Sequence, residues 1–278
     1  MIFSLTTSIF LIVLTTVILH TLMGCIIVPM RGSLSIDGTG HSVVFGIILG
    51  FMIGKSLNSI WLFFGAIISS ILMNFLINFF NKNKEISYDA SIGLSFSLLF
   101  SIGILLISVY ARNIHLDLDM ILLGNVEYAI YDTVNIFGNS VPKILLITNF
   151  SILIVLFFLY FFWKKIIYFL FDKDYSEFRG TNKKIFEIIF NIFCSCVIVA
   201  SFNVMGALIL VGIATSHFAF SWENSKNFLI FIKKSLLINV LISIFAVYFS
   251  IIYDLPIASS VSFFLTFFGI IKISFFNK

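Results

Sequence analysis

The chain has 278 residues, of which 60% are apolar and only 11% are charged. A soluble domain usually carries about 25% charged residues, so this composition excludes a water-soluble fold and indicates an integral membrane protein. The net charge is +4, but the lysines and arginines are scattered between apolar runs and form no contiguous basic face. The charge therefore gives no support to nucleic acid as a partner.

Nine apolar stretches in the chain are candidates for membrane-spanning helices. They predict an all-α integral membrane protein with a single membrane domain over residues 1–278. The stretch at 205–220 is short for a span and follows its predecessor with almost no loop, so a re-entrant helix is a competing interpretation there. The stretches are 2–29, 36–54, 59–80, 90–110, 141–163, 185–203, 205–220, 228–252 and 257–276.

The distribution of basic residues predicts the orientation of these helices, because cytoplasmic loops are enriched in lysine and arginine. If the basic loop at 164–184 is cytoplasmic, strict alternation of nine spans places fourteen basic residues inside and three outside. This asymmetry requires nine crossings, with the N-terminus outside and the C-terminus cytoplasmic. The exterior segment at 111–140 is then expected to form an acidic loop with an amphipathic helix.

The second helix begins with Ser35-Ile36-Asp37-Gly38-Thr39-Gly40-His41, which places a carboxylate and an imidazole four residues apart on one helical face. Ionisable groups within a span are expensive and usually face a cavity or a partner. Asp and His together suit a divalent ion such as zinc, manganese or iron(II). The alternative interpretation is an Asp near the membrane interface with a His packed beside it.

The same helix carries a small residue at every fourth position, a pattern that lets another helix approach closely. Beside Asp37 and His41, it suggests that this face lies against a neighbouring helix or a second protomer. His217, near the cytoplasmic end of the seventh helix, is expected at a similar depth and is a candidate third ligand. The small residues are Gly38, Ser42, Gly46, Gly50 and Gly54.

The cytoplasmic segment from Phe171 to Gly180 is mixed in charge, with apolar residues at 171, 175 and 178. This spacing predicts a short amphipathic helix closed by Gly180. Such a helix either lies on the membrane surface or docks onto a soluble subunit. The sequence has no Gly-x-x-x-x-Gly-Lys-Ser/Thr phosphate loop, so an ATP-driven motor of that type has to be another chain, and this chain is not expected to be an enzyme.

These residues together resemble the metal-ion permeases of the ATP-binding cassette transporters, which handle zinc, manganese or iron. The resemblance covers nearly the whole chain and rests on six blocks in the same order. The blocks are Arg31 to Gly46, Asp89 to Gly93, Asp117-Leu118-Asp119 with Leu123-Gly124-Asn125, Phe171 to Gly180, Met205 to Ile209, and Tyr253 to Pro256.

The resemblance implies that Asp37 and His41 contact the passing metal ion. It also implies a coupling helix seated on an ATPase subunit and formed by Phe171, Asp172, Ser176 and Gly180. The chain departs from the family pattern at four positions, where the family usually has Gly, Pro, Pro and Ala: Ile36, Phe45, His217 and Ser176.

The resemblance further implies a multi-pass protein of the bacterial cytoplasmic membrane, in contact with lipid and with three protein partners. These are an ATP-binding cassette ATPase, an extracytoplasmic metal-binding protein, and a second permease subunit that is an identical chain or a paralogue. The metal is cargo, and no permanently bound cofactor is expected. Two alternatives stay open: a secondary carrier or channel that relays protons through Asp37 and His41, and an importer of an organic metal chelate.

Overall fold

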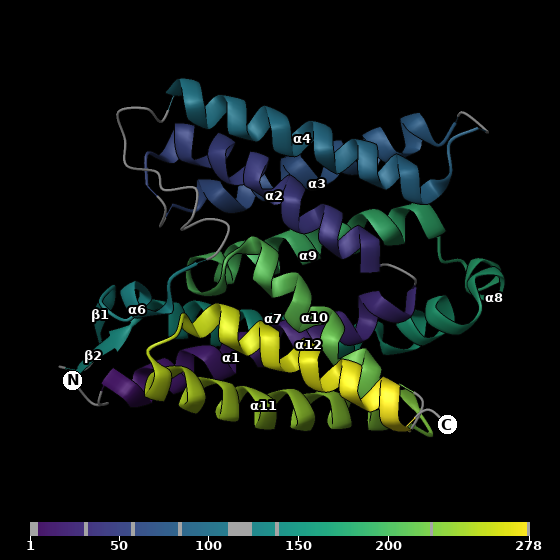
Figure 1. Ribbon diagram of the computed structural model, residues 1–278. Coiled ribbons are helices and arrows are strands. Elements are labelled where there is room, and N and C mark those ends of the chain that lie inside the picture. Colours follow the sequence, from purple (N-terminus) through teal and green to yellow (C-terminus); the bar gives the residue numbers. More distant parts are fainter. Residues whose placement is uncertain are drawn as a thin grey trace.

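The computed structural model describes residues 5–30, 33–56, 59–82, 85–110, 124–136, 139–222 and 225–276. Within these residues the protein is almost entirely helical, and most of the long helices run along one common direction (Figure 1). A helix lies over each of the nine apolar stretches. These helices are α1 (Leu5–Ile27), α2 (Ser33–Gly54), α3 (Trp61–Phe80), α4 (Tyr88–Tyr110), α7 (Lys143–Phe171), α9 (Lys183–Met205), α10 (Ala207–Ser221), α11 (Phe228–Tyr253) and α12 (Ile257–Phe276).

Seven helices in the described part of the chain are long and apolar enough to cross a membrane: α1, α2, α3, α4, α7, α11 and α12. The apolar stretches of α9 and α10 are shorter, at Ile188–Phe202 and Ile209–Ser221. Gly206 separates these two helices and has a φ of +66°, a conformation that glycine adopts without steric cost. The nine-span prediction therefore depends on whether α9 and α10 also cross the bilayer.

Helix α7 is longer than the apolar stretch that predicted it. We expected its end at residue 163, before the charged pair Lys164 and Lys165, but the helix continues to Phe171. Both lysines are exposed and lysine is a good helix former, so these charges do not interrupt the helix. Phe171 is its last residue, because the backbone of the next residue, Asp172, is extended.

Only part of the segment between α4 and α7, for which we expected an acidic loop with an amphipathic helix, lies among the described residues. Residues 111–123, which include Asp117 and Asp119, lie outside the described residues. The following part is a single helical turn, α6 (Val126–Ala129), and an antiparallel hairpin of β1 (Thr133–Ile136) and β2 (Asn139–Pro142). Three of the four residues of β1, Thr133, Val134 and Ile136, are β-branched and favour a strand. In the described part of the chain the fold is therefore all-α apart from this small hairpin.

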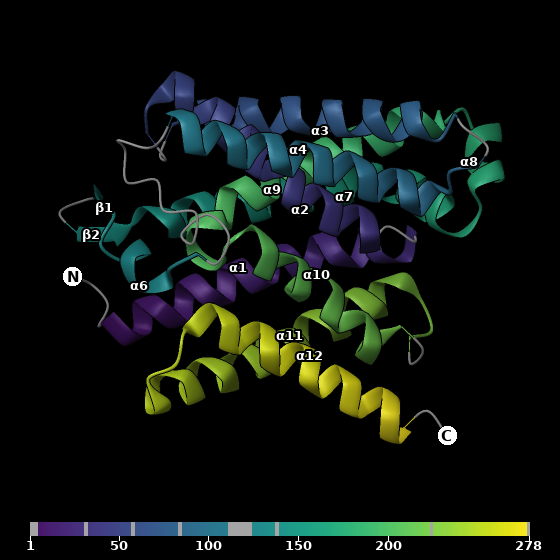
Figure 2. The same ribbon diagram turned by 45° about the horizontal axis from the view of Figure 1, so that its top comes forward.

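The helices form two groups with α2 between them. Helices α3 and α4 pack on one side of α2, while α9 and α10 contact it from the other, where α1, α11 and α12 complete the bundle (Figures 1 and 2). The N-terminus and the hairpin lie at one end of the bundle. The short helix α8 (Lys173–Phe178) and the C-terminus lie at the opposite end.

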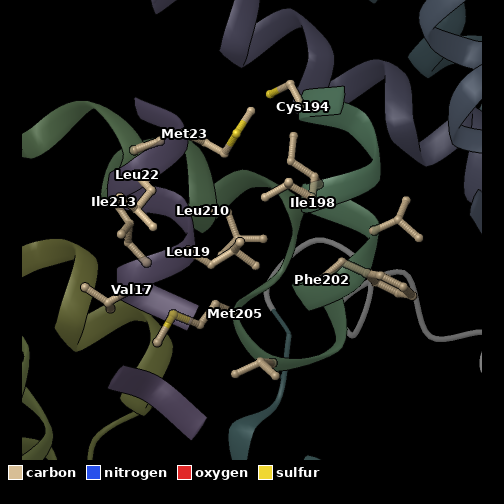
Figure 3. Close-up of a cluster of buried hydrophobic side chains, with 14 of the residues drawn as sticks. Val17, Leu19, Leu22, Met23, Cys194, Ile198, Phe202, Met205, Leu210 and Ile213 are labelled. Atoms are coloured by element: carbon tan, nitrogen blue, oxygen red, sulfur yellow. The ribbon is translucent and has the colours of Figure 1, made fainter. Parts of the chain in front are cut away.

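One part of the apolar core lies where α1, α9 and α10 meet. Figure 3 shows side chains of these three helices converging on one another, and each labelled residue is at most 4% exposed. This core fixes the α9–α10 junction against α1. The labelled residues are Val17, Leu19, Leu22, Met23, Cys194, Ile198, Phe202, Met205, Leu210 and Ile213.

Candidate functional site

The polar pair of α2 lies one helical turn apart. Nε2 of His41 is 3.6 Å from Oδ1 of Asp37. The Asp37 side chain is 42% exposed and that of His41 is 23% exposed, although most of α2 around them is buried. The pair therefore forms a partly open polar site in a part of α2 that is otherwise mostly buried.

The His41 ring lies against two aromatic side chains of α4. It stacks on Phe96 with a centroid distance of 5.1 Å and an interplanar angle of 17°, and it meets Phe100 nearly at a right angle, at 5.2 Å and 83°. Nδ1 of His41 is buried and has no hydrogen-bond partner. Nε2 is thus the ring nitrogen on the Asp37 side of the imidazole.

The small-residue stripe of α2 packs against helices of the same chain. A Cβ added to Gly46 would lie 2.6 Å from the carbonyl oxygen of Gly65 in α3, and one added to Gly50 would lie 2.4 Å from the carbonyl oxygen of Trp61. The Ser69 hydroxyl of α3 donates a hydrogen bond to the carbonyl oxygen of Ser42.

Both ends of this stripe are also filled from within the chain. A Cβ on Gly38 would meet side chains of α3 and α4, and one on Gly54 would meet Ser59. The sequence predicts that this face lies against a neighbouring helix or a second protomer. In the structure, atoms of α3 and α4 fill the stripe, so the neighbours are helices of the same chain.

His217 is not part of this site. The structure buries it completely, where it packs against Gly24 of α1 and the ring of Phe231 of α11. Neither of its ring nitrogens has a hydrogen-bond partner. Among the described residues, no three or more His, Cys, Asp or Glu side chains are close enough together to hold a metal ion. The structure therefore does not bring His217 to Asp37 and His41 as the third ligand that we had considered.

The segment that follows α7 forms a compact helical cap, α8, at the end of the bundle. The Asp172 side chain accepts a hydrogen bond from the Tyr175 backbone N–H, which caps the N-terminus of the helix. At the other end, Gly180 has a φ of +82°, its N–H donates to the carbonyl oxygen of Glu177, and the N–H of Thr181 donates to that of Ser176. This pair of bonds is a Schellman motif, so Gly180 closes the helix.

Two exposed phenylalanines lie at the ends of α8. Phe171, shortly before the helix, is 63% exposed, and Phe178, its last residue, is 86% exposed. The Ser176 side chain is buried on the inner side of the helix. Arg179 donates a hydrogen bond from Nε to the Tyr175 hydroxyl at 2.9 Å, which raises the pKa of Arg179 above its ordinary value. The cap thus presents aromatic and charged side chains outward from a fixed backbone.

Two of the sequence blocks meet at the end of the bundle opposite α8. A Cβ on Gly124, which has a φ of +68°, would lie 2.3 Å from the backbone nitrogen of Gly206 and 2.6 Å from that of Met205. The chain after residue 123 therefore packs directly on the junction between α9 and α10.

Sequence reasoning did not identify Phe96 and Phe100 as neighbours of the polar pair. The chain contains 36 phenylalanines, and two of them four apart in an apolar helix carry no distinguishing pattern. The absence of a side chain at Gly38 is the one local signal, because it leaves space for a large group from a neighbouring helix.

Comparison with protein families gives one match over nearly the whole chain. The family described as the ABC 3 transport family matches residues 3–276. The fold is also similar to that of a chain in a solved structure titled "PsaBC from Streptococcus pneumoniae in complex with Fab". The TM-score is 0.82 at 21% sequence identity, and the match covers 98% of this chain and 91% of that chain.

Two curated relatives have names that state a transported metal. The chain is 30% identical over 208 residues to the zinc transport system membrane protein TroD of Treponema pallidum, covering 75% of this chain and 57% of the relative. It is 36% identical over 123 residues to the manganese transport system membrane protein MntD of Bacillus subtilis, covering 44% of this chain and 41% of the relative. The matches thus span about half the length of these two relatives.

Proposed function

The chain belongs to the ABC 3 transport family, and we propose that it is the permease subunit of an importer that moves a divalent transition metal ion across the bacterial cytoplasmic membrane. It is a multi-pass membrane protein and not itself an enzyme. The names of its relatives favour zinc or manganese as the cargo. Iron(II) shares the same Asp and His ligand preference and is the third candidate.

The observation that carries this proposal is the Asp37–His41 pair. A carboxylate and an imidazole 3.6 Å apart, partly exposed in a mostly buried part of α2, offer two ligands to a borderline divalent ion. An ion in transit needs coordination that is weak enough to release it, whereas four protein ligands in a closed site hold zinc permanently. Two ligands from one chain meet this requirement.

A second permease subunit completes the site in this proposal. The described part of one chain supplies an Asp and a His, and a second copy or a paralogue across a symmetry axis supplies an equivalent pair. The four ligands surround the ion only transiently, while the two subunits face one another. Because the glycine stripe is filled by α3 and α4, the subunits approach through the exposed side of Asp37 and His41.

We assign the energy source to an ATPase subunit that docks at α8. The sequence contains no phosphate loop, so ATP hydrolysis of that type has to occur on a partner chain. Helix α8 has a fixed backbone and exposes aromatic side chains, as a contact helix requires. An extracytoplasmic metal-binding protein delivers the ion at the other end, where the hairpin lies.

Our proposed orientation places α8 and the C-terminus in the cytoplasm and the N-terminus outside. The fourteen-to-three distribution of basic residues supports it. In this arrangement α9 and α10 also cross the membrane, despite their shorter apolar stretches, and the chain has nine crossings.

Metal uptake by cells that express the permease with its ATPase tests this function. Asp37→Ala and His41→Ala should abolish uptake of zinc or manganese while expression stays normal. Uptake at the wild-type rate in both variants would remove the pair from the metal path. Competition among zinc, manganese and iron(II) in the same cells identifies the cargo.

The same assay separates this function from a secondary carrier that relays protons through Asp37 and His41. A carrier keeps its uptake when the ATPase subunit is inactivated, whereas an ATP-driven importer loses it. Family membership does not favour the carrier.

A further inference from the structure

Two aromatic side chains of α4 lie against His41. Phe96 and Phe100 lie one turn apart on α4, and both rings face the imidazole of His41. Phe96 covers it face to face, while Phe100 meets it nearly at a right angle. Together the two rings restrict rotation of the imidazole about its bond to Cβ.

The orientation that they hold leaves one nitrogen available. Nδ1 is buried without a hydrogen-bond partner, whereas Nε2 lies 3.6 Å from the Asp37 carboxylate. A neutral histidine binds a metal ion through one ring nitrogen while the other carries the proton. An ion between Asp37 and His41 therefore meets Nε2, and a half-turn of the ring about its bond to Cβ would put the carbon Cε1 in that place.

Gly38 makes this stacking possible. A Cβ at position 38 would lie 2.6 Å from the Cε methyl of Met73, 3.1 Å from Cγ2 of Ile92 and 3.3 Å from Cδ1 of Phe96. Any larger residue would push these side chains of α3 and α4 outward. The missing side chain thus allows Phe96 to approach α2 one turn before His41.

We propose that Phe96 is a positioning residue for metal capture, supported by Phe100. It holds the His41 ring so that Nε2 stands beside Asp37 before the ion arrives. Binding is tighter when the ligands are already in place, because less conformational freedom is lost on association. This inference rests on the proposed function, in which Asp37 and His41 contact the ion.

If Phe96 positions His41, replacing it should weaken capture of the metal ion and leave the later steps of transport unchanged. With the permease and its ATPase reconstituted in vesicles, Phe96→Leu should raise the KM for metal uptake about threefold to tenfold, the range expected for one lost aromatic contact. The maximal rate should stay within about twofold of the wild-type rate. Phe96→Tyr keeps the ring and should restore a near-normal KM. Phe96→Met is a second ring-free variant that keeps more of the side-chain volume.

Leu99→Ala is the matched control for loss of packing. Leu99 is 3% exposed and belongs to the same small core cluster of α2, α3 and α4 against which Phe96 packs. This variant should lower thermal stability and leave the KM unchanged. An equal rise of KM in Phe96→Leu and Leu99→Ala would show that Phe96 serves packing alone and would overturn the inference.

The measurements also separate this inference from the proposed function. An unchanged KM in both Phe96→Leu and Phe96→Met, with uptake lost in Asp37→Ala and His41→Ala, would refute positioning by Phe96 and leave the metal site intact. Normal uptake in Asp37→Ala and His41→Ala would refute the metal site itself, and the positioning role with it.

Discussion

Gly46 and Gly65 bring α2 and α3 into direct backbone contact. A Cβ on Gly65 would lie 1.9 Å from the carbonyl oxygen of Gly46, a distance that real structures do not tolerate. The helix that carries Asp37 and His41 is therefore held by a contact that only glycine permits. Such close approach is a common way for membrane helices to associate, since apolar side chains gain little by leaving lipid.

Replacing Gly65 should destabilise the protein. In Gly65→Ala the added methyl group meets backbone atoms of α2, which cannot move without separating the two helices, and we expect a loss of about 3 kcal/mol in unfolding free energy. Thermal unfolding in detergent measures it. Gly93→Ala in α4 is the control, because a Cβ there has no heavy atom within 4 Å. Equal melting temperatures for the two variants would contradict the packing.

Gly124→Ala should loosen the end of the bundle opposite α8. The variant places a side chain at a φ of +68° and within 2.3 Å of the Gly206 backbone nitrogen. Hydrogen exchange of the amides near the α9–α10 junction should become faster. Gly180→Ala has a similar positive φ but open space around its Cβ, so it isolates the backbone cost of about 1 kcal/mol. A Gly124→Ala variant no less stable than Gly180→Ala would show that the predicted contact is absent.

Two replacements of Gly180 should separate its backbone role from the bulk of its side chain. Asparagine tolerates the left-handed conformation, whereas a β-branched residue does not. Gly180→Asn should keep metal uptake coupled to ATP hydrolysis, while Gly180→Val should reduce uptake and leave the ATPase running without transport. Beyond this backbone cost the stability of the permease should change little, because no atom lies within 4 Å of the added Cβ. Full uptake in Gly180→Val would remove the coupling role of α8.

His217→Leu should retain metal uptake. The imidazole is fully buried with both nitrogens unpartnered, so an apolar side chain of similar size should be neutral or stabilising. Uptake and melting temperature should both equal or exceed those of the wild-type protein. A loss of uptake at normal expression would show that His217 participates in transport after all.

Much of the fold follows from the sequence because lipid imposes a simple rule on it. Backbone groups in hydrocarbon have to be satisfied within a helix, so long apolar runs predict helices, and a helix lies over each of the nine runs. Charged residues were less informative about helix ends. Lys164 and Lys165 mark the expected end of the apolar run, yet α7 continues through them to Phe171.

The sequence identified site residues only where an ionisable side chain occurs within an apolar helix. Asp37 and His41 are ionisable groups in an apolar helix, and their spacing of four residues predicts their proximity. Phe96 and Phe100 are apolar residues of an apolar helix and therefore carry no distinguishing pattern, although their rings lie against His41. The glycine stripe predicts a close contact but not its partner, which depends on how α3 folds back on α2.

The central claim is that Asp37 and His41 contact a divalent metal ion in transit. Uptake of radiolabelled zinc and manganese should fall by about tenfold or more in Asp37→Asn and His41→Ala, because losing one metal ligand costs more than about 1.4 kcal/mol. Asp254→Asn, at an exposed left-handed position that asparagine tolerates, should keep uptake unchanged. Wild-type uptake in both Asp37→Asn and His41→Ala, at normal expression, would contradict the account.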